Sequence, residues 1–439
     1  MKRIFGTYAY GAGPRDGCWW DQTIAAPAWD RLDGDTDVDV AIIGGGFTGV
    51  SAALHLAEAG VGALVLEAES PGFGASGRNG GFCCLGGAML KEPAMTRTYG
   101  AAAAAEYWRA EAGAVHFAEA LIDRLQIDVD RHSKGETQLA HRPKDMEKFR
   151  RRAEQMVRDG EGEPILTEAK DLAAQGLAGP FHGALTTPVG FGLNPRKYLF
   201  GMAAAARTAG ARICASSPVT ALSRAKDGFD LTTPVGRVRA RQVIIATNGY
   251  SSDDLPDWLS ARYVPAHSNV LVTRPLSDAE LAAAGWTSAQ ASYDTRGLLH
   301  YFRLMPDRRF LFGMRGGLHS SPVAEARARA RNRRDFEAMF PAWAHVESPF
   351  AWSGMVCLAR NRVPFVGPVP DHPGLFAGMA YHGNGVAMGS WSGSLLARLI
   401  QGENGVPTVM RTPLARFPLG PLRRMLMPPF YIARALADL

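Results

Sequence analysis

Val38-Asp-Val-Ala-Ile-Ile-Gly-Gly-Gly-Phe-Thr-Gly49 decides the fold, because an apolar, β-branched run meets Gly44, Gly46 and Gly49 in G-x-G-x-x-G spacing. The run predicts a strand, and the Ala-rich segment 47–59 that follows predicts a helix. In such a turn the first glycine permits a tight bend, the second lets the backbone approach a pyrophosphate, and the third lets helix and strand pack closely. The stretch therefore predicts a dinucleotide-binding unit, with a glycine turn that binds nothing as the alternative.

A second apolar run, Ala63-Leu-Val-Leu-Glu67, places an acidic residue at the end of a predicted strand. A carboxylate there accepts hydrogen bonds from both hydroxyls of an adenosine ribose and repels a 2′-phosphate, so NADP is disfavoured. The segment 71–81 is dense in glycine and carries Ser76, Arg78 and Asn79, as expected of a loop that runs along an extended cofactor. These residues alone leave FAD and NAD both open.

Gly74-Ala-Ser-Gly-Arg-Asn-Gly-Gly81 after this fingerprint resembles the FAD-dependent D-amino-acid oxidase superfamily, in its branch of γ-glutamylputrescine-oxidase-like amine oxidases. Further segments are similar to the family's motifs and extend the resemblance over most of the chain; they are 192–195 with 211–219, 243–250, 352–354, 362–367 and 380–386. The resemblance implies FAD as cofactor, held by Gly44, Gly46, Phe47, Thr48, Gly49, Glu67, Ala68, Gly74, Ala75, Ser76, Arg78, Asn79, Gly80, Gly81, Val219, Ala246, Asn248, Gly354, Gly383, Asn384, Gly385 and Val386.

The C-terminal motif also has a physical explanation of its own. Gly383 and Gly385 precede a helical pattern over 386–400, whose first backbone N–H groups could face the negative charge of a reduced flavin. An ordinary glycine-capped helix start is the alternative. Cys357 lies near the place where sarcosine oxidases attach flavin covalently, but its register is offset by about two residues, so non-covalent FAD and a buried strand cysteine are predicted.

The scatter of these segments predicts an α/β fold with a discontinuous, Rossmann-like FAD-binding domain (1–92, 181–255 and 350–439). An α+β substrate-binding domain would take the inserts 93–180 and 256–349. Helices are expected over 101–125 and 144–157, and strands over 269–273, 298–304 and 309–313. The resemblance implies that a mixed sheet in this domain roofs the flavin.

The resemblance implies an FAD-dependent enzyme that oxidises a primary or secondary amine to an imine by hydride transfer to flavin N5, after which water gives an aldehyde or ketone. The protein would orient the C–H bond and keep the amine neutral in an apolar pocket. Tyr301, His382 and Trp352 are the predicted catalytic or pocket residues, with Tyr381, Phe82 and Cys83 beside them. Core packing is the alternative for each of these side chains.

Several positions depart from the family's pattern. His382 and Asn384 stand where Ser and His are usual, and Asn361 stands where Asp is usual. The two places from which relatives hold a substrate carboxylate with arginine carry Met355-Val356 and Phe82-Cys83-Cys84 instead. A simple α-amino acid is therefore a less favoured substrate, although Arg303 or Arg315 could substitute.

The positions of the lysines in the sequence bear on whether oxygen is the electron acceptor. The last of the eight lysines is Lys226, so the lysine that supplies positive charge for oxygen activation in sarcosine-oxidase relatives has no counterpart. Arg303 or Arg315, protonated His267 or His382, or the substrate ammonium would have to serve. We expect slow reoxidation by oxygen. An oxidase is favoured, while a dehydrogenase with a quinone or carrier acceptor, an NAD-binding dehydrogenase and a non-catalytic FAD-binding protein stay open.

Composition excludes several other classes. The 439 residues carry a formal charge of +6, and the basic run 327–334 lies in a helical pattern, so we expect no nucleic-acid partner. The odd count of five cysteines has no CxxC pair, which predicts no disulfide framework, no metal site and a cytoplasmic location. The sequence shows no signal-peptide pattern and no run long enough to span a membrane.

The basic and apolar tail 411–439 leaves peripheral membrane contact open. Its five prolines should break any long helix, so a tail that packs over the FAD-binding domain is favoured. The sequence leaves the oligomeric state open.

Overall fold

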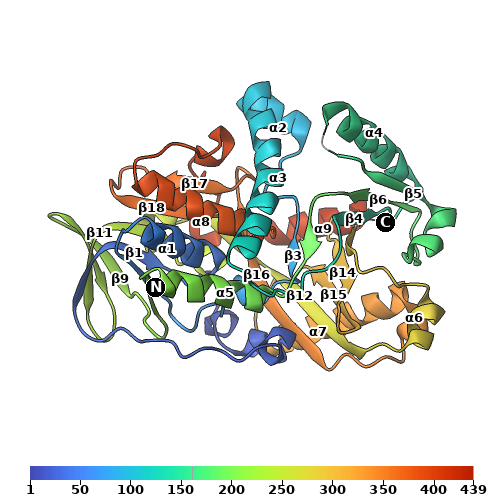
Figure 1. Cartoon of the computed structure of the whole chain (residues 1–439), viewed down its shortest axis with the longest axis horizontal. Coiled ribbons are helices and arrows are strands. Elements are labelled where there is room, and N and C mark those ends of the chain that lie inside the picture. Colours follow the sequence, from blue (N-terminus) through green and yellow to red (C-terminus); the bar gives the residue numbers. More distant parts are fainter. Residues whose placement is uncertain (161, 439) are drawn as a thin grey trace.

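The computed structural model describes residues 1–160 and 162–438, whose strands form two large sheets (Figure 1). The first sheet has the order β17-β18-β11-β1-β2-β8, with the hairpin β9–β10 paired to β11. Strands β8, β2, β1, β11 and β18 are parallel, whereas β17 and the hairpin are antiparallel. The bounds are β1 (Thr36–Ile43), β2 (Ala63–Leu66), β8 (Arg212–Cys214), β9 (Ala221–Ala225), β10 (Gly228–Thr232), β11 (Arg237–Ile245), β17 (Phe365–Pro368) and β18 (Leu375–Met379).

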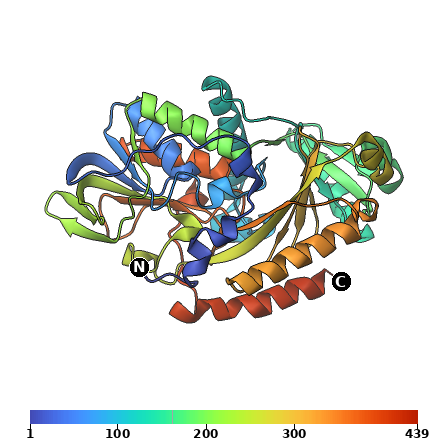
Figure 2. The ribbon, with the colours of Figure 1, turned by 90° about the horizontal axis from the view of Figure 1, so that it is seen from below.

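Burial on both faces explains the apolar runs of the central strands. Every residue of β2 is buried, as are the last four residues of β1. Three helices cover one face, with α1 (Phe47–Glu58) packed against both α5 (Pro195–Thr208) and α8 (Ala387–Ile400) (Figure 2). The Ser51 hydroxyl donates to the Ser390 carbonyl at 2.6 Å, which joins α1 to α8. This is the Rossmann-like half of the predicted α/β fold.

The second sheet is mixed and has the order β16-β12-β15-β14-β13-β4-β6-β5. Helix α7 (Pro322–Met339) lies across β12, β15 and β16, as Figure 2 shows. Seven aromatic side chains fill the space below the sheet, and burial of such side chains dominates the stability of a core; they are Trp286, Phe302, Phe310, Phe312, Phe336, Phe340 and Trp343. The strands are β4 (Glu136–Leu139), β5 (Ile165–Glu168), β6 (Gly183–Thr187), β12 (Tyr263–Pro275), β13 (Ala291–Asp294), β14 (His300–Leu304), β15 (Arg309–Arg315) and β16 (Phe350–Ala359).

The remaining elements surround these sheets. A small two-stranded sheet joins β3 (Phe82–Cys83) to β7 (Phe191–Gly192). The other helices are α2 (Glu92–Tyr99), α3 (Ala101–Arg124), α4 (Pro143–Asp159), α6 (Asp278–Ala284) and α9 (Met427–Ala437). The predicted helices over 101–125 and 144–157 are α3 and α4, and the three predicted strands fall in β12, β14 and β15. The predicted fold class is confirmed.

The sheet pairings bear on the expected domain boundaries. Strands β6 and β16 belong to the second sheet, although 181–255 and 350–439 were expected to be FAD-binding segments. The division into two domains remains a proposal. We propose that the second and third FAD-binding segments begin after β6 and after β16, so that both strands belong to the substrate-binding domain.

The C-terminal tail differs from the expectation. Helix α9 forms despite Pro428 and Pro429, because both stand in its first turn, where the proline N–H is not needed. The Asp438 carboxylate accepts the N–H groups of Gly297 at 2.7 Å and Leu298 at 3.2 Å. The end of the tail therefore packs on the β13–β14 connection of the second sheet, so the expected packing over the FAD-binding domain is wrong for this helix.

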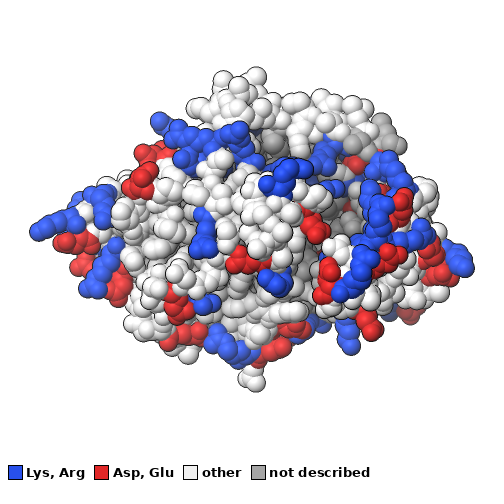
Figure 3. All heavy atoms as spheres, turned by 90° about the horizontal axis from the view of Figure 1, so that it is seen from above, with Lys and Arg blue, Asp and Glu red and all other residues white. Residues whose placement is uncertain are grey.

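Acidic and basic side chains are interspersed over the face that Figure 3 shows. Within the described part of the chain, no helix is long and apolar enough to cross a bilayer, and no group of three His, Cys, Asp or Glu side chains could hold a metal ion.

Candidate active site

The glycine turn between β1 and α1 has the geometry that its sequence predicts. Gly44 has φ +108°, and its N–H donates to the Leu66 carbonyl of the next strand at 3.0 Å. A Cβ at Gly49 would lie 2.0 Å from the Gly44 carbonyl oxygen, so a larger residue cannot occupy this position unless the backbone moves. Gly46, Phe47 and Thr48 line the space beside the turn, and the Phe47 N–H at the start of α1 donates to the Ser76 hydroxyl at 2.9 Å.

Glu67 lies beside this turn at the end of β2. Its carboxylate accepts the Gly45 N–H at 2.7 Å and the Glu69 N–H at 3.0 Å. Burial raises the pKa of Glu67, and these two N–H groups oppose that rise. Among the described residues no basic side chain forms an ion pair with Glu67, so its remaining lone pairs can accept hydroxyl donors. Its environment fits the ribose of an adenosine.

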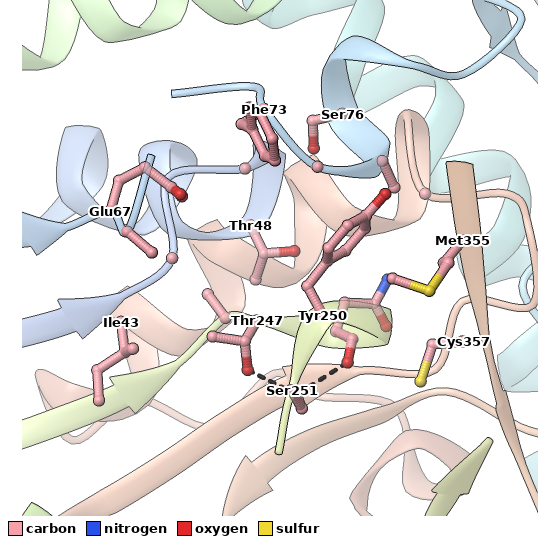
Figure 4. A pocket seen from close by; sticks show the side chains of 18 of the residues that line it. Ile43, Thr48, Glu67, Phe73, Ser76, Thr247, Tyr250, Ser251, Met355 and Cys357 are labelled. Carbon is pink, nitrogen blue, oxygen red and sulfur yellow. Dashed lines mark hydrogen bonds between the residues drawn. The ribbon is translucent and has the colours of Figure 1, made fainter. Parts of the chain in front are cut away.

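A cavity, here called the dinucleotide cavity, extends from this turn toward β16. Figure 4 shows Ile43 and Glu67 on one side of it and Met355 and Cys357 on the opposite side. Burial raises the pKa of the Cys357 thiol to about 12, so this cysteine stays protonated at neutral pH. The predicted FAD-binding residues that line this cavity are Gly44, Gly46, Phe47, Thr48, Glu67, Ala68, Gly74, Ala75, Ser76, Asn79, Val219, Ala246, Asn248, Gly383, Gly385 and Val386.

The N-terminus of α8 closes the same cavity. Gly385 and Val386 line it, and α8 begins at Ala387 with its positive end at this place. Tyr381, which also lines the cavity, shares a hydrogen bond of 2.9 Å with Thr48 of α1. The two helix N-termini and the carboxylate fit a dinucleotide with an anionic centre.

A second cavity adjoins the first. Both cavities are bordered by Ala75, Asn79, Met355, Val356, Gly383 and Val386. Four other predicted FAD-binding residues line only the second cavity, namely Arg78, Gly80, Gly354 and Asn384. Two line neither: Gly49 packs α1 on β1, and Gly81 lies against Leu193 and Arg303.

Arg78 is a buried cation in the wall of the second cavity. Its Nε donates to the Phe73 carbonyl at 2.7 Å and its Nη1 to the Ser353 carbonyl at 3.4 Å. Nη2 is buried without a partner. A buried donor that the protein leaves unpaired is consistent with an acceptor atom supplied by a bound cofactor.

Tyr301 is the one of the three predicted catalytic candidates that lines the second cavity. Its hydroxyl and that of Ser268 are 2.9 Å apart and share a hydrogen bond. Its ring meets Phe82, another lining residue, edge to face with centroids 5.6 Å apart. An aromatic wall with an orienting hydroxyl is therefore present.

Trp352 and His382 line neither cavity. Trp352 is fully buried and its Nε1 donates to the Arg78 carbonyl at 2.8 Å. His382 Nδ1 lies 2.7 Å from the Gly87 carbonyl, and its Nε2 accepts the Ala359 N–H at 3.1 Å. Burial lowers the pKa of His382 to about 4, so its ring is neutral. Both side chains are occupied by backbone partners, so a pocket role is proposed for Tyr301 alone among the three candidates.

The basic side chains that the sequence predicts near the site differ in their surroundings. Arg303 is fully buried and donates to the Leu193 carbonyl and to His132, each at 2.8 Å. Burial lowers the pKa of His267 to about 4, and its ring packs on Phe5. Arg315 lines the second cavity, and no carboxylate of the described residues forms an ion pair with it. Arg315 is therefore the candidate for a positive charge offered to a ligand.

Several residues that line the two cavities were not predicted from the sequence. Met1, Arg3 and Tyr10 border the dinucleotide cavity, and Ser268, Tyr293 and Leu299 border the second one. None of them stands in a recognisable motif. Only the alternation of the strands could have indicated which side chains of β12 and β13 face the cavity.

Comparisons with known proteins agree with this geometry. Residues 39–399 match the family described as FAD dependent oxidoreductase (DAO). The chain is 30% identical over 383 residues to gamma-glutamylputrescine oxidoreductase of Escherichia coli, covering 85% of this chain and 86% of that protein. It is 29% identical to the probable oxidoreductase OrdL of Haemophilus influenzae, covering 83% of each chain.

Solved structures share the fold at lower identity. Glycine oxidase from Geobacillus kaustophilus superposes with a TM-score of 0.70 at 20% identity, covering 87% of this chain and 99% of that one. Iminodiacetate oxidase from Chelativorans sp. superposes with a TM-score of 0.69 at 21% identity, covering 85% and 98%.

Proposed function

The chain belongs to the FAD-dependent oxidoreductase (DAO) family, in its γ-glutamylputrescine-oxidase-like branch, and from this premise we propose that it oxidises an amine in the second cavity. A primary or secondary amine would become an imine, which water converts to an aldehyde or ketone. The observation that carries the proposal is the second cavity itself, which is lined by aromatic side chains and shares six bordering residues with the dinucleotide cavity.

FAD is the cofactor, and when bound it accepts the hydride that the amine carbon loses. We propose that Glu67 and the N-terminus of α1 hold its adenosine diphosphate part. The N-terminus of α8, at Gly385 and Val386, would stabilise negative charge on the reduced ring.

The residues of the second cavity bind and orient the amine. Phe82, Tyr301 and Leu299 surround it with apolar surface, which disfavours the ammonium form and so supports oxidation. The hydroxyls of Ser268 and Tyr301 offer a donor and an acceptor that fix the position of the nitrogen.

The substrate is proposed to be an extended amine rather than a simple α-amino acid. The positions from which an arginine would hold an adjacent carboxylate carry Val356 and Cys83. Arg315 could instead meet an anionic group elsewhere on a longer molecule. The name of the Escherichia coli relative, which refers to γ-glutamylputrescine, supports a substrate of this kind.

A second candidate function is a dehydrogenase that passes its electrons to a quinone or a carrier protein. Oxygen activation benefits from a fixed cation, yet no lysine follows Lys226, and His267 and His382 are neutral. Arg315 and Arg78 are then the cations in the wall of the second cavity, and the charge of an arginine is more diffuse than that of lysine.

One experiment tests both candidates. Aldehyde, hydrogen peroxide and flavin reoxidation are measured with an amine panel under air and with a quinone, in the wild type, Arg315→Met and, as a matched charge control, the exposed Arg334→Met. We expect aldehyde from extended amines, reoxidation by oxygen slower than flavin reduction, and a further slowing of about tenfold in Arg315→Met only. No aldehyde from any amine would contradict the proposed function, and fast reoxidation unaffected by Arg315→Met would contradict the role of Arg315.

A further inference from the structure

Glu136 is a buried carboxylate directly behind the wall of the second cavity. It begins β4 and is only 5% exposed. Its Oε1 accepts the Tyr293 hydroxyl at 3.0 Å, while its Oε2 is buried without a hydrogen bond of good geometry, and the Cys84 thiol and the Leu85 N–H are the other donors near the carboxylate. No ion pair with a basic side chain involves Glu136 in the described part of the chain. A carboxylate placed in this way destabilises the fold, which points to a role other than packing.

Glu136 is connected to the cavity through Tyr293 and Cys84, both of which line it. Tyr293 is paired with Tyr301 across β13 and β14, so the two phenol side chains share one face of the sheet. Hydroxyls thus follow one another across this face from Ser268 and Tyr301 to Tyr293, and the row ends at Glu136. An amine in the cavity can reach this row, whereas it cannot reach Glu136 directly.

We propose that Glu136 takes up the ammonium proton of the bound amine through the Tyr293 hydroxyl. This inference rests on the proposed function. An N–H bond of the ammonium breaks and the proton passes to Tyr293 Oη, while the original Tyr293 proton passes to Glu136 Oε1. The ammonium becomes an amine and the carboxylate becomes a carboxylic acid, without transfer of electrons. Tyr293 is the group that touches the substrate, and Glu136 is a positioning residue that acts through it.

The groups around Glu136 set the pH at which it can act. Burial raises the pKa of Glu136 to about 7, and Glu111 from α3 raises it too, while Tyr293, the Cys84 thiol and the Leu85 N–H lower it. Arg315, on the cavity side, acts electrostatically on Cys84. Because only the carboxylate accepts a proton, amine oxidation should increase as the pH rises through about 7. If the protein instead bound only amines that are already neutral in water, the rate of oxidation would rise with pH through the pKa of the free amine, about 10.

The test is anaerobic stopped-flow reduction of the FAD-loaded protein by its best amine, as a function of pH. The variants are Glu136→Gln, Tyr293→Phe and, as a matched control, Glu111→Gln. We expect an ionisation near pH 7 in the wild type. Glu136→Gln and Tyr293→Phe should lose it and fall about 100-fold in limiting rate. Glu111→Gln should keep the limiting rate but shift the ionisation to lower pH, because a carboxylate that repels the charge of Glu136 is gone.

Infrared difference spectra of the resting protein give a readout that does not depend on turnover. Burial raises the pKa of Glu111 to about 7 as well, so the spectra are recorded in the Glu111→Gln background. There the carbonyl band of the protonated Glu136 carboxyl should disappear as the pH rises, and the double variant with Glu136→Gln should lack this band. A pH step in flavin reduction that survives Glu136→Gln, or an unchanged infrared titration, would overturn this inference while leaving the proposed function intact. If no amine reduces the flavin, the proposed function fails and the relay fails with it.

Discussion

A single carboxylate, Glu67, is proposed to select the cofactor that the first cavity accepts. Both of its oxygens are held by backbone N–H groups, and no basic side chain of the described residues neutralises it. Its orientation is therefore fixed before any ligand binds. This arrangement favours a neutral diol over a phosphate at the same place.

Glu67→Ala should accordingly weaken FAD retention. Loss of hydrogen bonds to a charged acceptor corresponds to about 1.5–3 kcal/mol, or roughly 10- to 100-fold in Kd. Glu58→Ala, which removes an exposed carboxylate from the far end of α1, is the control and should bind as the wild type does. Released flavin is measured after dialysis and identified by chromatography. FMN in place of FAD, or full occupancy in Glu67→Ala, would contradict the role of Glu67.

At this scale, sequence motifs indicated which residues lie at the cavity where they fix the backbone. Gly44, Glu67 and Gly385 line the dinucleotide cavity, and their contact with FAD stays a prediction. The prediction of a pocket position failed for Trp352 and His382, because each finds its hydrogen-bond partners in nearby backbone and has no need of the cavity. Aromatic and histidine side chains near a motif are as often structural as functional.

At the scale of elements, the approach of α1 to β1 depends on the absence of a side chain at Gly49. A Cβ there would lie 2.0 Å from the Gly44 carbonyl oxygen, which belongs to the turn itself. Gly49→Ala should therefore destabilise the protein by about 3 kcal/mol and reduce FAD binding, because the turn must move.

Gly113→Ala is the matched control for this substitution. Gly113 lies within α3, and a Cβ at this position meets nothing within 4 Å. Alanine should stabilise that helix by up to about 1 kcal/mol. Thermal unfolding of both variants, with and without added FAD, measures the difference. Equal unfolding temperatures for the two variants would show that the turn tolerates a side chain at Gly49.

Whether a segment forms a helix or a strand was predictable, because the periodicity of its apolar residues is a local feature of the sequence. The Ala-rich run of α3 and the apolar runs of β14 and β15 have the periodicities of helix and strand. The location of α9 was not predictable, because its partners at the β13–β14 connection lie more than a hundred residues earlier in the chain. Local patterns carry no information about such contacts.

At the scale of the whole molecule, the second cavity forms where segments distant in sequence meet. Its wall takes Phe82 and Cys84 from the N-terminal part, Tyr301 and Arg315 from the middle and Asn384 from the C-terminal part. No single stretch of the sequence identifies this cavity. The family resemblance predicted that a substrate pocket exists but could not name Tyr293 or Glu136, which belong to no motif.

The central claim is that an extended amine, bound in the second cavity, reduces FAD held in the first. Anaerobic titration of the flavin absorbance against one panel of compounds tests it most directly: extended primary and secondary amines, glycine, sarcosine, D-alanine and NADH. We predict that extended amines bleach the oxidised flavin band fastest and that NADH leaves it unchanged. Bleaching by NADH with none by amines, or D-alanine or sarcosine as the best reductant, would contradict the account.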